Sequence, residues 1–452
     1  MTHLAESDLQ AFLAGRLEPA RNRSIVRHLA RGCAACTARL LAAVPEDMIL
    51  PPRAACDLGD EYDAAIDRAL KAVRPLATRW RKDCAQIDRG LSLIREHPEG
   101  ETGLTWGQRQ SIRGWKHVEV LLALSFDRRH RDPQDMLNLA ECAQEVADRL
   151  EPPAYGAAFL LDLRARAWAE LGNAYRVNER FARAEAAVEE ARSLLEHGTG
   201  DRTIEARLDE IEASLRKDRR QLPEAHRLLD KVHRAWLALG DYHLAGRALV
   251  LKGVVFGVGS EPLQAARILH RAIELLDPSR DPHLFAAAHH DLLASLVEAG
   301  RFAEAGRILF KSDLRRLFAD DPLSLLRLRW LDAKILAARG RSEDAERVFR
   351  EVRASFIDSG LEYLAGVAGM DLAAVLLRQG KKAEARDLSW EIYAAFRRVD
   401  VDPQAVLAVK SFEAASRMEV ATAPMAERVG SFLGLLQRSP GLRFDPALMV
   451  TG

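Results

Sequence analysis

The stretch that decides the fold is WAELGNAY, Trp168–Tyr175, followed shortly by FARAEAAVEEA, Phe181–Ala191. The small residues Gly172 and Ala184 would let two consecutive helices approach closely, and the large side chains would fill the groove between neighbouring helix pairs. Across the whole chain Ala, Leu, Arg and Glu dominate, while β-branched and aromatic residues are sparse. This composition favours helix over strand, so we expect an all-α protein.

The spacing of this stretch resembles the tetratricopeptide repeat, a helix pair with the signature W-x2-L-G-x2-Y…A…A. The signature residues are Trp168, Leu171, Gly172, Tyr175, Ala184 and Ala191. The resemblance covers the marker positions of both helices. It implies that the pair stacks against similar pairs on either side.

The second-helix motif recurs at a regular interval. The segments RFARAEAA, QLPEAHRLL, EPLQAARIL, RFAEAGRIL, RSEDAERVF and KKAEARDLS place marker alanines at 184, 225, 265, 305, 345 and 385, in steps of 41, 40, 40, 40 and 40. First helices agree, because Leu237–Phe256 and Asp358–Leu377 align without gaps. Ala143 lies 41 residues before Ala184 and indicates one earlier pair. The period of 40 exceeds the 34 of the standard repeat, so longer helices are expected.

These patterns predict four segments. They are a small head over 1–50, a helical connector over 51–108, an α-solenoid of TPR-like helix pairs over 109–418, and a capping helix and tail over 419–452. Stacked pairs bury a continuous core and leave a concave face lined by first helices. Such a face is suited to a peptide or a partner helix. A passive spacer or a dimerisation scaffold is the alternative.

Charge and cysteine content bound the function. The 66 basic and 66 acidic residues balance, so net charge does not indicate a nucleic-acid or acidic-membrane partner. No run of about 18 uncharged apolar residues occurs, so no transmembrane helix is expected, and the first residues lack the pattern of a signal peptide. Five cysteines, an odd number, argue against a disulfide framework and favour a cytoplasmic protein. Cys56, Cys84 and Cys142 have no partner spacing and are expected to be reduced thiols.

The head is expected to form three short helices, the first capped by Ser7. So small a unit buries little apolar surface, and a metal ion would stabilise it. The stretch HLARGCAAC, His28–Cys36, offers an imidazole and two thiols, which suit tetrahedral Zn²⁺. His3, just before the first helix, is a candidate fourth ligand. A redox-active C-x2-C pair and structural residues without metal remain alternatives.

The run from His3 to Cys36 also resembles the zinc-binding anti-sigma domain, which pairs an early histidine with a later His-x3-Cys-x2-Cys. The resemblance implies the ligands His3, His28, Cys33 and Cys36. Here four residues, LARG, separate the second histidine from the first cysteine, where the family usually has three. The family binds extracytoplasmic-function sigma factors, and in some members cysteine oxidation releases zinc.

Two functions therefore follow as hypotheses. One is a soluble regulator of anti-sigma type, with a zinc head that binds a sigma factor and an array that binds a peptide or protein signal. The other is a protein-interaction scaffold with a purely structural zinc head. An enzyme is not expected, because the common metalloprotease, phosphate-loop, dinucleotide and serine-hydrolase motifs are missing from the sequence. His289 and His290 are expected to be packing or surface residues, and direct DNA binding is not expected because acids intersperse the head's arginines.

Overall fold

The computed structural model describes most of the repeat region and part of the head. The described residues are 4–13, 17, 21, 25, 28, 29, 35, 36, 39, 40, 114–129, 131–319, 321–399, 401–438 and 441–449. The chain divides into two units, Met1–Arg79 and Trp80–Gly452. The predicted connector, 51–108, lies outside the described residues.

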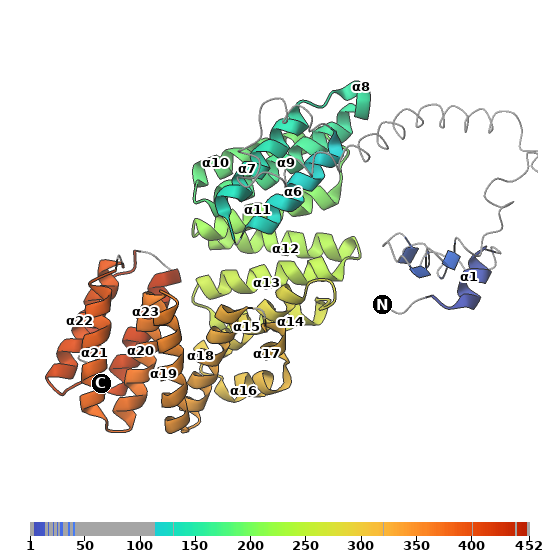
Figure 1. Ribbon diagram of the computed structural model, residues 1–452. Coiled ribbons are helices and arrows are strands. Elements are labelled where there is room, and N and C mark those ends of the chain that lie inside the picture. The colour runs from blue at the N-terminus through green and yellow to red at the C-terminus, as the bar shows by residue number, and fades with distance from the viewer. Residues whose placement is uncertain are drawn as a thin grey trace, which may run out of the picture. The chain divides into compact units, whose positions relative to one another are not determined.

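Every element of the described ranges is helical, and the second unit is built from consecutive helix pairs (Figure 1). The pairs are α6 (Trp115–Arg128) with α7 (Pro133–Asp148), α9 (Ala157–Val177) with α10 (Phe181–Leu195), α11 (Arg202–Asp218) with α12 (Leu222–Ala238), α13 (Tyr242–Val258) with α14 (Pro262–Leu275), α15 (Pro282–Glu298) with α16 (Phe302–Lys311), α18 (Pro322–Ala338) with α19 (Ser342–Asp358), α20 (Glu362–Arg378) with α21 (Lys382–Phe396), and α22 (Pro403–Arg417) with α23 (Ala423–Arg438). The short helices α8 (Pro152–Tyr155), α17 (Leu314–Leu317) and η3 (Pro446–Met449) lie between or after them. The predicted all-α solenoid of TPR-like pairs is confirmed.

The marker alanines explain why the pairs repeat. Ala143, Ala184, Ala225, Ala265, Ala305, Ala345 and Ala385 each lie in the second helix of a pair, and each is 0% exposed. Only a methyl group fits where two helix backbones come this close. Ala426, 41 residues after the last of them, is also fully buried and lies in α23. The same packing position therefore extends to the last described helix pair.

The turn between the two helices of a pair repeats as well. A residue in the left-handed conformation occurs at Gly300, Gly340 and Gly380, with φ of 73°, 77° and 76°. The equivalent positions in earlier pairs are non-glycine, for example Ser260 with φ of 60°. The chain closes each helix end with backbone hydrogen bonds, as in Arg301 N–H to Leu296 O at 2.8 Å. The 40-residue period is thus set by turns as well as helices.

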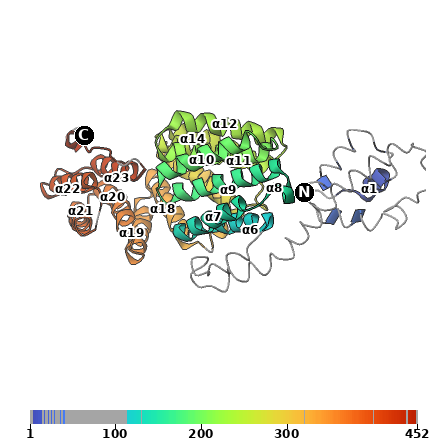
Figure 2. The same cartoon turned by 90° about the horizontal axis from the view of Figure 1, so that it is seen from above.

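Close helix approach is confirmed at Gly172. A Cβ atom there would lie 3.3 Å from the Ala184 carbonyl oxygen, so α9 and α10 meet almost backbone to backbone. Trp168 packs between two core clusters, one of its own pair and one containing Met136 and Leu137 of α7. Small residues bring the two helices of a pair together, and large ones join neighbouring pairs, as the sequence predicts. Figure 2 shows α7 beside α9, the two helices that Trp168 joins.

The described part of the head begins with α1 (Glu6–Leu13). The helix starts one residue before Ser7, because the N–H groups of Asp8 and Leu9 already bond to the Ala5 carbonyl. The prediction that Ser7 caps this helix was therefore wrong. Described residues near 21–29 and 35–40 are also helical, and Leu9, Ile25 and Cys36 are fully buried, so these three belong to the core of the head. Within the described ranges, no helix combines the length and apolar character needed to span a bilayer.

Candidate functional site

Three ion pairs join successive first helices near the start of the array. They are Arg166–Glu119 between α9 and α6 at 2.6 Å, Arg207–Glu170 between α11 and α9 at 2.7 Å, and Arg247–Glu210 between α13 and α11 at 2.5 Å. The three arginines stand 41 and 40 residues apart, which are the steps of the marker alanines at 184, 225 and 265. The arginine is therefore a repeat position. Its spacing is visible in the sequence, on first helices, whereas the marker alanines lie on second helices.

We call these three ion pairs the ion-pair ladder, and Arg207 bonds to two of its carboxylates. Its Nε and Nη2 atoms donate to the two oxygens of Glu170 at 2.7 and 3.0 Å, and Nη1 donates to Glu210 at 2.6 Å. The side chains of Glu170 and Glu210 are only 11% and 4% exposed. Burial alone would raise the pKa of Glu170, but the charge and hydrogen bonds of Arg207 outweigh it and hold that pKa below its ordinary value. Glu170 is therefore paired as a carboxylate, and Glu210 accepts hydrogen bonds from both Arg207 and Arg247.

Three guanidinium groups surround one aromatic ring on this face. The centroid of the Phe126 ring, in α6, lies 3.9 Å from the guanidinium carbon of Arg129, 5.2 Å from that of Arg207 and 5.6 Å from that of Arg247. All three distances fall within cation–π range. The contributing helices α6, α11 and α13 are the first, third and fourth first helices described, so their convergence shows that the first-helix face is concave here. We call these four residues the arginine cluster.

Arg129 differs from the other two arginines of the cluster. It follows α6 and donates from Nη1 to the Phe126 carbonyl oxygen at 2.8 Å. It forms no ion pair with any carboxylate of the described residues, although Asp127 and Asp281 favour its charged form at longer range. Burial lowers the pKa of Arg129, and the positive charges of Arg247 and Arg207 lower it further. Positive side chains held close together attract an anion, so Arg129 and its two neighbouring arginines are a candidate anion-binding site.

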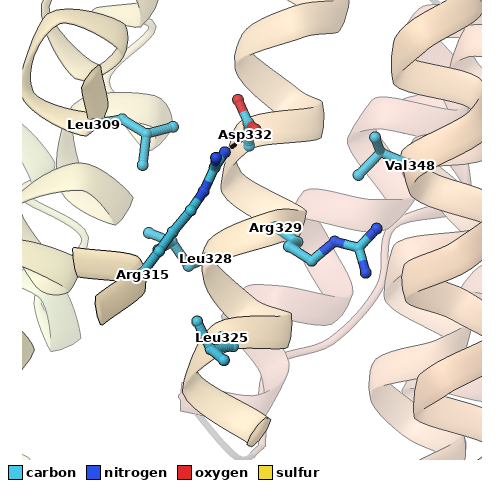
Figure 3. Close-up of a pocket in the computed structure, with 7 residues that line it drawn as sticks. All are labelled: Leu309, Arg315, Leu325, Leu328, Arg329, Asp332 and Val348. Atoms are coloured by element: carbon cyan, nitrogen blue, oxygen red, sulfur yellow. Dashed lines mark hydrogen bonds and ion pairs between the residues drawn. The ribbon is translucent and has the colours of Figure 1, made fainter. Parts of the chain in front are cut away.

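Apart from the arginine cluster, a cavity lies where the repeat is interrupted. Helix α16 stops at Lys311, and the short α17 precedes α18. A cavity of about 520 Å³ is lined there by Leu309, Arg315, Leu325, Leu328, Arg329, Asp332 and Val348. Figure 3 shows Arg315 and Asp332 pointing toward one another, and their ion pair measures 3.2 Å. An adjoining hollow of about 400 Å³ includes Phe310, which is 90% exposed.

Two of the four predicted zinc ligands are described. Cys36 is fully buried and its Sγ atom accepts the Leu4 N–H at 3.4 Å, which brings the chain start beside this thiol. The Nε2 atom of His28 is buried and has no hydrogen-bond partner among the described residues. His3 and Cys33 lie outside the described residues. Within the described ranges no group of three or more His, Cys, Asp or Glu side chains could hold a metal ion, and the predicted set has only two members there.

The remaining candidate residues lie on repeat helices or outside the described ranges. His289 and His290 are on α15, where His289 Nδ1 lies 3.0 Å from the Phe285 carbonyl oxygen and His290 stands edge-on to Phe318. Cys142 is buried in α7, whereas Cys56 and Cys84 are outside the described residues. Of these positions, the described ones, Cys142, His289 and His290, are not part of the arginine cluster.

Comparisons with known proteins concern the fold. No protein-family model matches the chain, and no curated protein matches it in sequence. Among solved structures, aspartyl phosphate phosphatase F from Bacillus subtilis is similar with 14% identity, 63% of this chain and 72% of that chain covered, and a TM-score of 0.46.

Two further similar structures are peptide or factor complexes. A Rap protein complexed with competence and sporulation factor has 10% identity, coverage of 72% and 88%, and a TM-score of 0.49. NprR in complex with its cognate peptide NprX has 12% identity, coverage of 72% and 89%, and a TM-score of 0.44. Because all three TM-scores lie below 0.5, the fold assignment rests on the helix pairs themselves.

Proposed function

We propose that the protein is a non-enzymatic regulator whose repeat array binds a peptide or protein segment along the concave first-helix face. The convergence of α6, α11 and α13 on Phe126 is the observation that carries this proposal. Ion pairs join neighbouring first helices on this face, and its arginine side chains keep part of their surface in solvent, 21% for Arg207 and 25% for Arg247. A rigid, polar and concave surface binds an extended or helical segment without ordering itself first.

Selection from a displayed library of random peptides on the full-length protein tests this proposal. Binding of the enriched peptide is then measured by calorimetry for the wild type and for Phe126→Ala. Loss of the ring that the three arginines surround is expected to weaken binding about tenfold or more. Trp390→Ala is the matched control, because Trp390 is a large aromatic side chain, 56% exposed, on the second helix α21.

Enrichment of no peptide would contradict the proposal. So would a peptide whose binding survives Phe126→Ala and is lost with Trp390→Ala.

For the head, we propose that His3, His28, Cys33 and Cys36 bind Zn²⁺. Two described features support a fit: the buried His28 Nε2 without a partner, and the Leu4 N–H that donates to Cys36 Sγ, as backbone amides do to a metal-bound thiolate. Bound zinc would tie the chain start to the two later helical segments and supply folding energy to a unit with a small core.

Metal analysis tests the zinc proposal on the full-length protein, purified without chelator. The wild type is expected to hold about one zinc per chain, since four protein ligands complete a structural site. Cys33→Ser/Cys36→Ser is expected to hold essentially none, whereas Cys142→Ser, a buried array cysteine, keeps the wild-type content. Less than about half a zinc per chain in the wild type would contradict the ligand assignment.

The finer role of the head is that of an anti-sigma module working in the cytoplasm. The resemblance of its sequence to the zinc-binding anti-sigma domain supports this role, and the partner would be an extracytoplasmic-function sigma factor. Co-purification of the full-length protein with the sigma factor encoded beside its gene is the test. If the two proteins do not associate, the scaffold with a structural zinc head becomes the better description.

A further inference from the structure

We infer that Arg129, Arg207 and Arg247 around Phe126 form a binding site for a single carboxylate group, either the C-terminus or an Asp or Glu side chain of the bound segment. The inference deepens the proposed function, because it names the chemical group that the concave face would recognise. The site is built from three different helix pairs and therefore exists only in the folded array.

Arg129 is the guanidinium of the cluster that forms no ion pair within the part of the chain that the structure describes. Three guanidinium groups face two buried carboxylates, those of Glu170 and Glu210. Arg207 is shared by both acids, and among the described residues Arg247 forms its ion pair with Glu210. Arg129 is paired with neither, and its guanidinium lies nearest to the ring. One carboxylate at this point would give Arg129 the ion-pair partner that Arg207 and Arg247 already have.

The hydrogen-bonding capacity points the same way. A guanidinium carries five N–H donors. Arg207 directs donors from all three of its nitrogens to carboxylates, so it is largely satisfied. Arg129 directs one donor to a backbone carbonyl, and Arg247 directs one to Glu210. Both arginines therefore retain donors in the fork arrangement that matches a carboxylate.

The surrounding acids favour a singly charged ligand over a phosphate dianion. Asp127, which is exposed, and Asp281, which caps α15, both act on the charge of Arg129 from beyond ion-pair distance. Because both acids repel an anion, a phosphate dianion would meet more repulsion here than a singly charged carboxylate. A carboxylate could accept charge-assisted hydrogen bonds from Arg129 and Arg247.

The test has one arm that does not depend on a peptide. Thermal unfolding of the full-length protein is followed in acetate, phosphate and chloride at matched ionic strength, for the wild type, Arg129→Gln and Arg227→Gln. Arg227 is the control because it is 77% exposed on the second helix α12. Acetate is expected to raise the midpoint in the wild type and Arg227→Gln relative to Arg129→Gln. Equal responses of all three proteins, or an Arg129-dependent response to phosphate but not acetate, would overturn the inference.

The second arm uses soluble random octapeptides retained by the immobilised full-length protein and identified by mass spectrometry. Four sets are compared, with and without Asp and Glu, and as C-terminal acids or amides, which separates the two sources of the carboxylate. Peptides with a carboxylate are expected to bind about tenfold more tightly, and Arg129→Gln is expected to remove that preference. Retention without any carboxylate preference overturns the inference. An acetate effect with no retained peptide leaves the anion site standing and contradicts the proposed function instead.

Discussion

Replacing Arg207 by methionine gives the most direct test of the ion-pair ladder. Methionine keeps much of the stem volume but removes every donor to Glu170 and Glu210. Glu210 still has Arg247 at 2.5 Å, whereas Glu170, with its side chain 11% exposed, loses its only ion-pair partner among the described residues. Breaking a buried pair by removing one partner costs about 3–5 kcal/mol, because a buried charge is left uncompensated. We expect a loss of that size at pH 7.

The assay is urea unfolding of the full-length protein followed by helical circular dichroism. The second variant, Glu170→Leu/Arg207→Met, removes both charges and fills the site with apolar groups. It is expected to recover most of the lost stability, since apolar replacement of a buried pair is often neutral or favourable. Arg227→Met, an exposed arginine on a second helix, is the control and should change stability by less than about 0.5 kcal/mol.

The pH dependence gives an independent check. In the wild type the pKa of Glu170 is lowered by folding. Its contribution to stability is therefore present above the unfolded-state pKa of about 4.3 and is lost as the pH falls through the folded-state pKa. In Arg207→Met the carboxyl is buried without a partner and gains nothing from ionisation. The deficit of the variant should therefore shrink between pH 7 and pH 4. A loss below about 1 kcal/mol at pH 7, or a double variant no more stable than the single one, would refute the reasoning.

Three further perturbations test the packing, the turns and a buried histidine. In Gly366→Ala the added methyl would overlap the buried Phe396 ring, so a loss of about 1–3 kcal/mol is expected in urea unfolding despite the better helix propensity. Ser260→Gly should raise stability by about 1 kcal/mol, because Ser260 holds φ at 60° in the turn after α13; an unchanged urea midpoint would contradict this. Burial, and then the charge of Arg280, lower the pKa of His243 below its ordinary 6.5, and its Nδ1 accepts the Asp277 N–H at 3.1 Å. The neutral imidazole of His243 therefore stabilises the fold fully above pH 6.5, and this stabilisation declines as the pH falls below 6.5. The thermal midpoint of His243→Gln should fall less than that of the wild type between pH 7.5 and 5.5.

The helix pairs could be predicted because their determinants are local and repeated. A small residue is required wherever two helices of a pair cross, so each unit carries its alanine at the same position, from Ala143 to Ala385. A further step of 41 residues, like that from Ala184 to Ala225, leads from Ala385 to Ala426 and places α23 in the same scheme. The arginines at 166, 207 and 247 follow the same arithmetic and could have been found by scanning first helices.

The zinc ligands remain a prediction, of which the described residues include His28 and Cys36. Their sequence order and residue types carry the hypothesis, and the Leu4 N–H bond to Cys36 adds one contact between the chain start and the C-x2-C segment.

The sequence by itself determined that this protein is a helical repeat array, because period, marker alanines and turn positions depend only on contacts within and between adjacent units. Only the tertiary structure decided that Phe126 and Arg129 at the end of α6 meet Arg247 of α13. That meeting depends on the rotation accumulated from one helix pair to the next, to which every interface contributes a little. No local sequence pattern specifies this accumulated rotation, so the arginine cluster could be recognised only in the folded array.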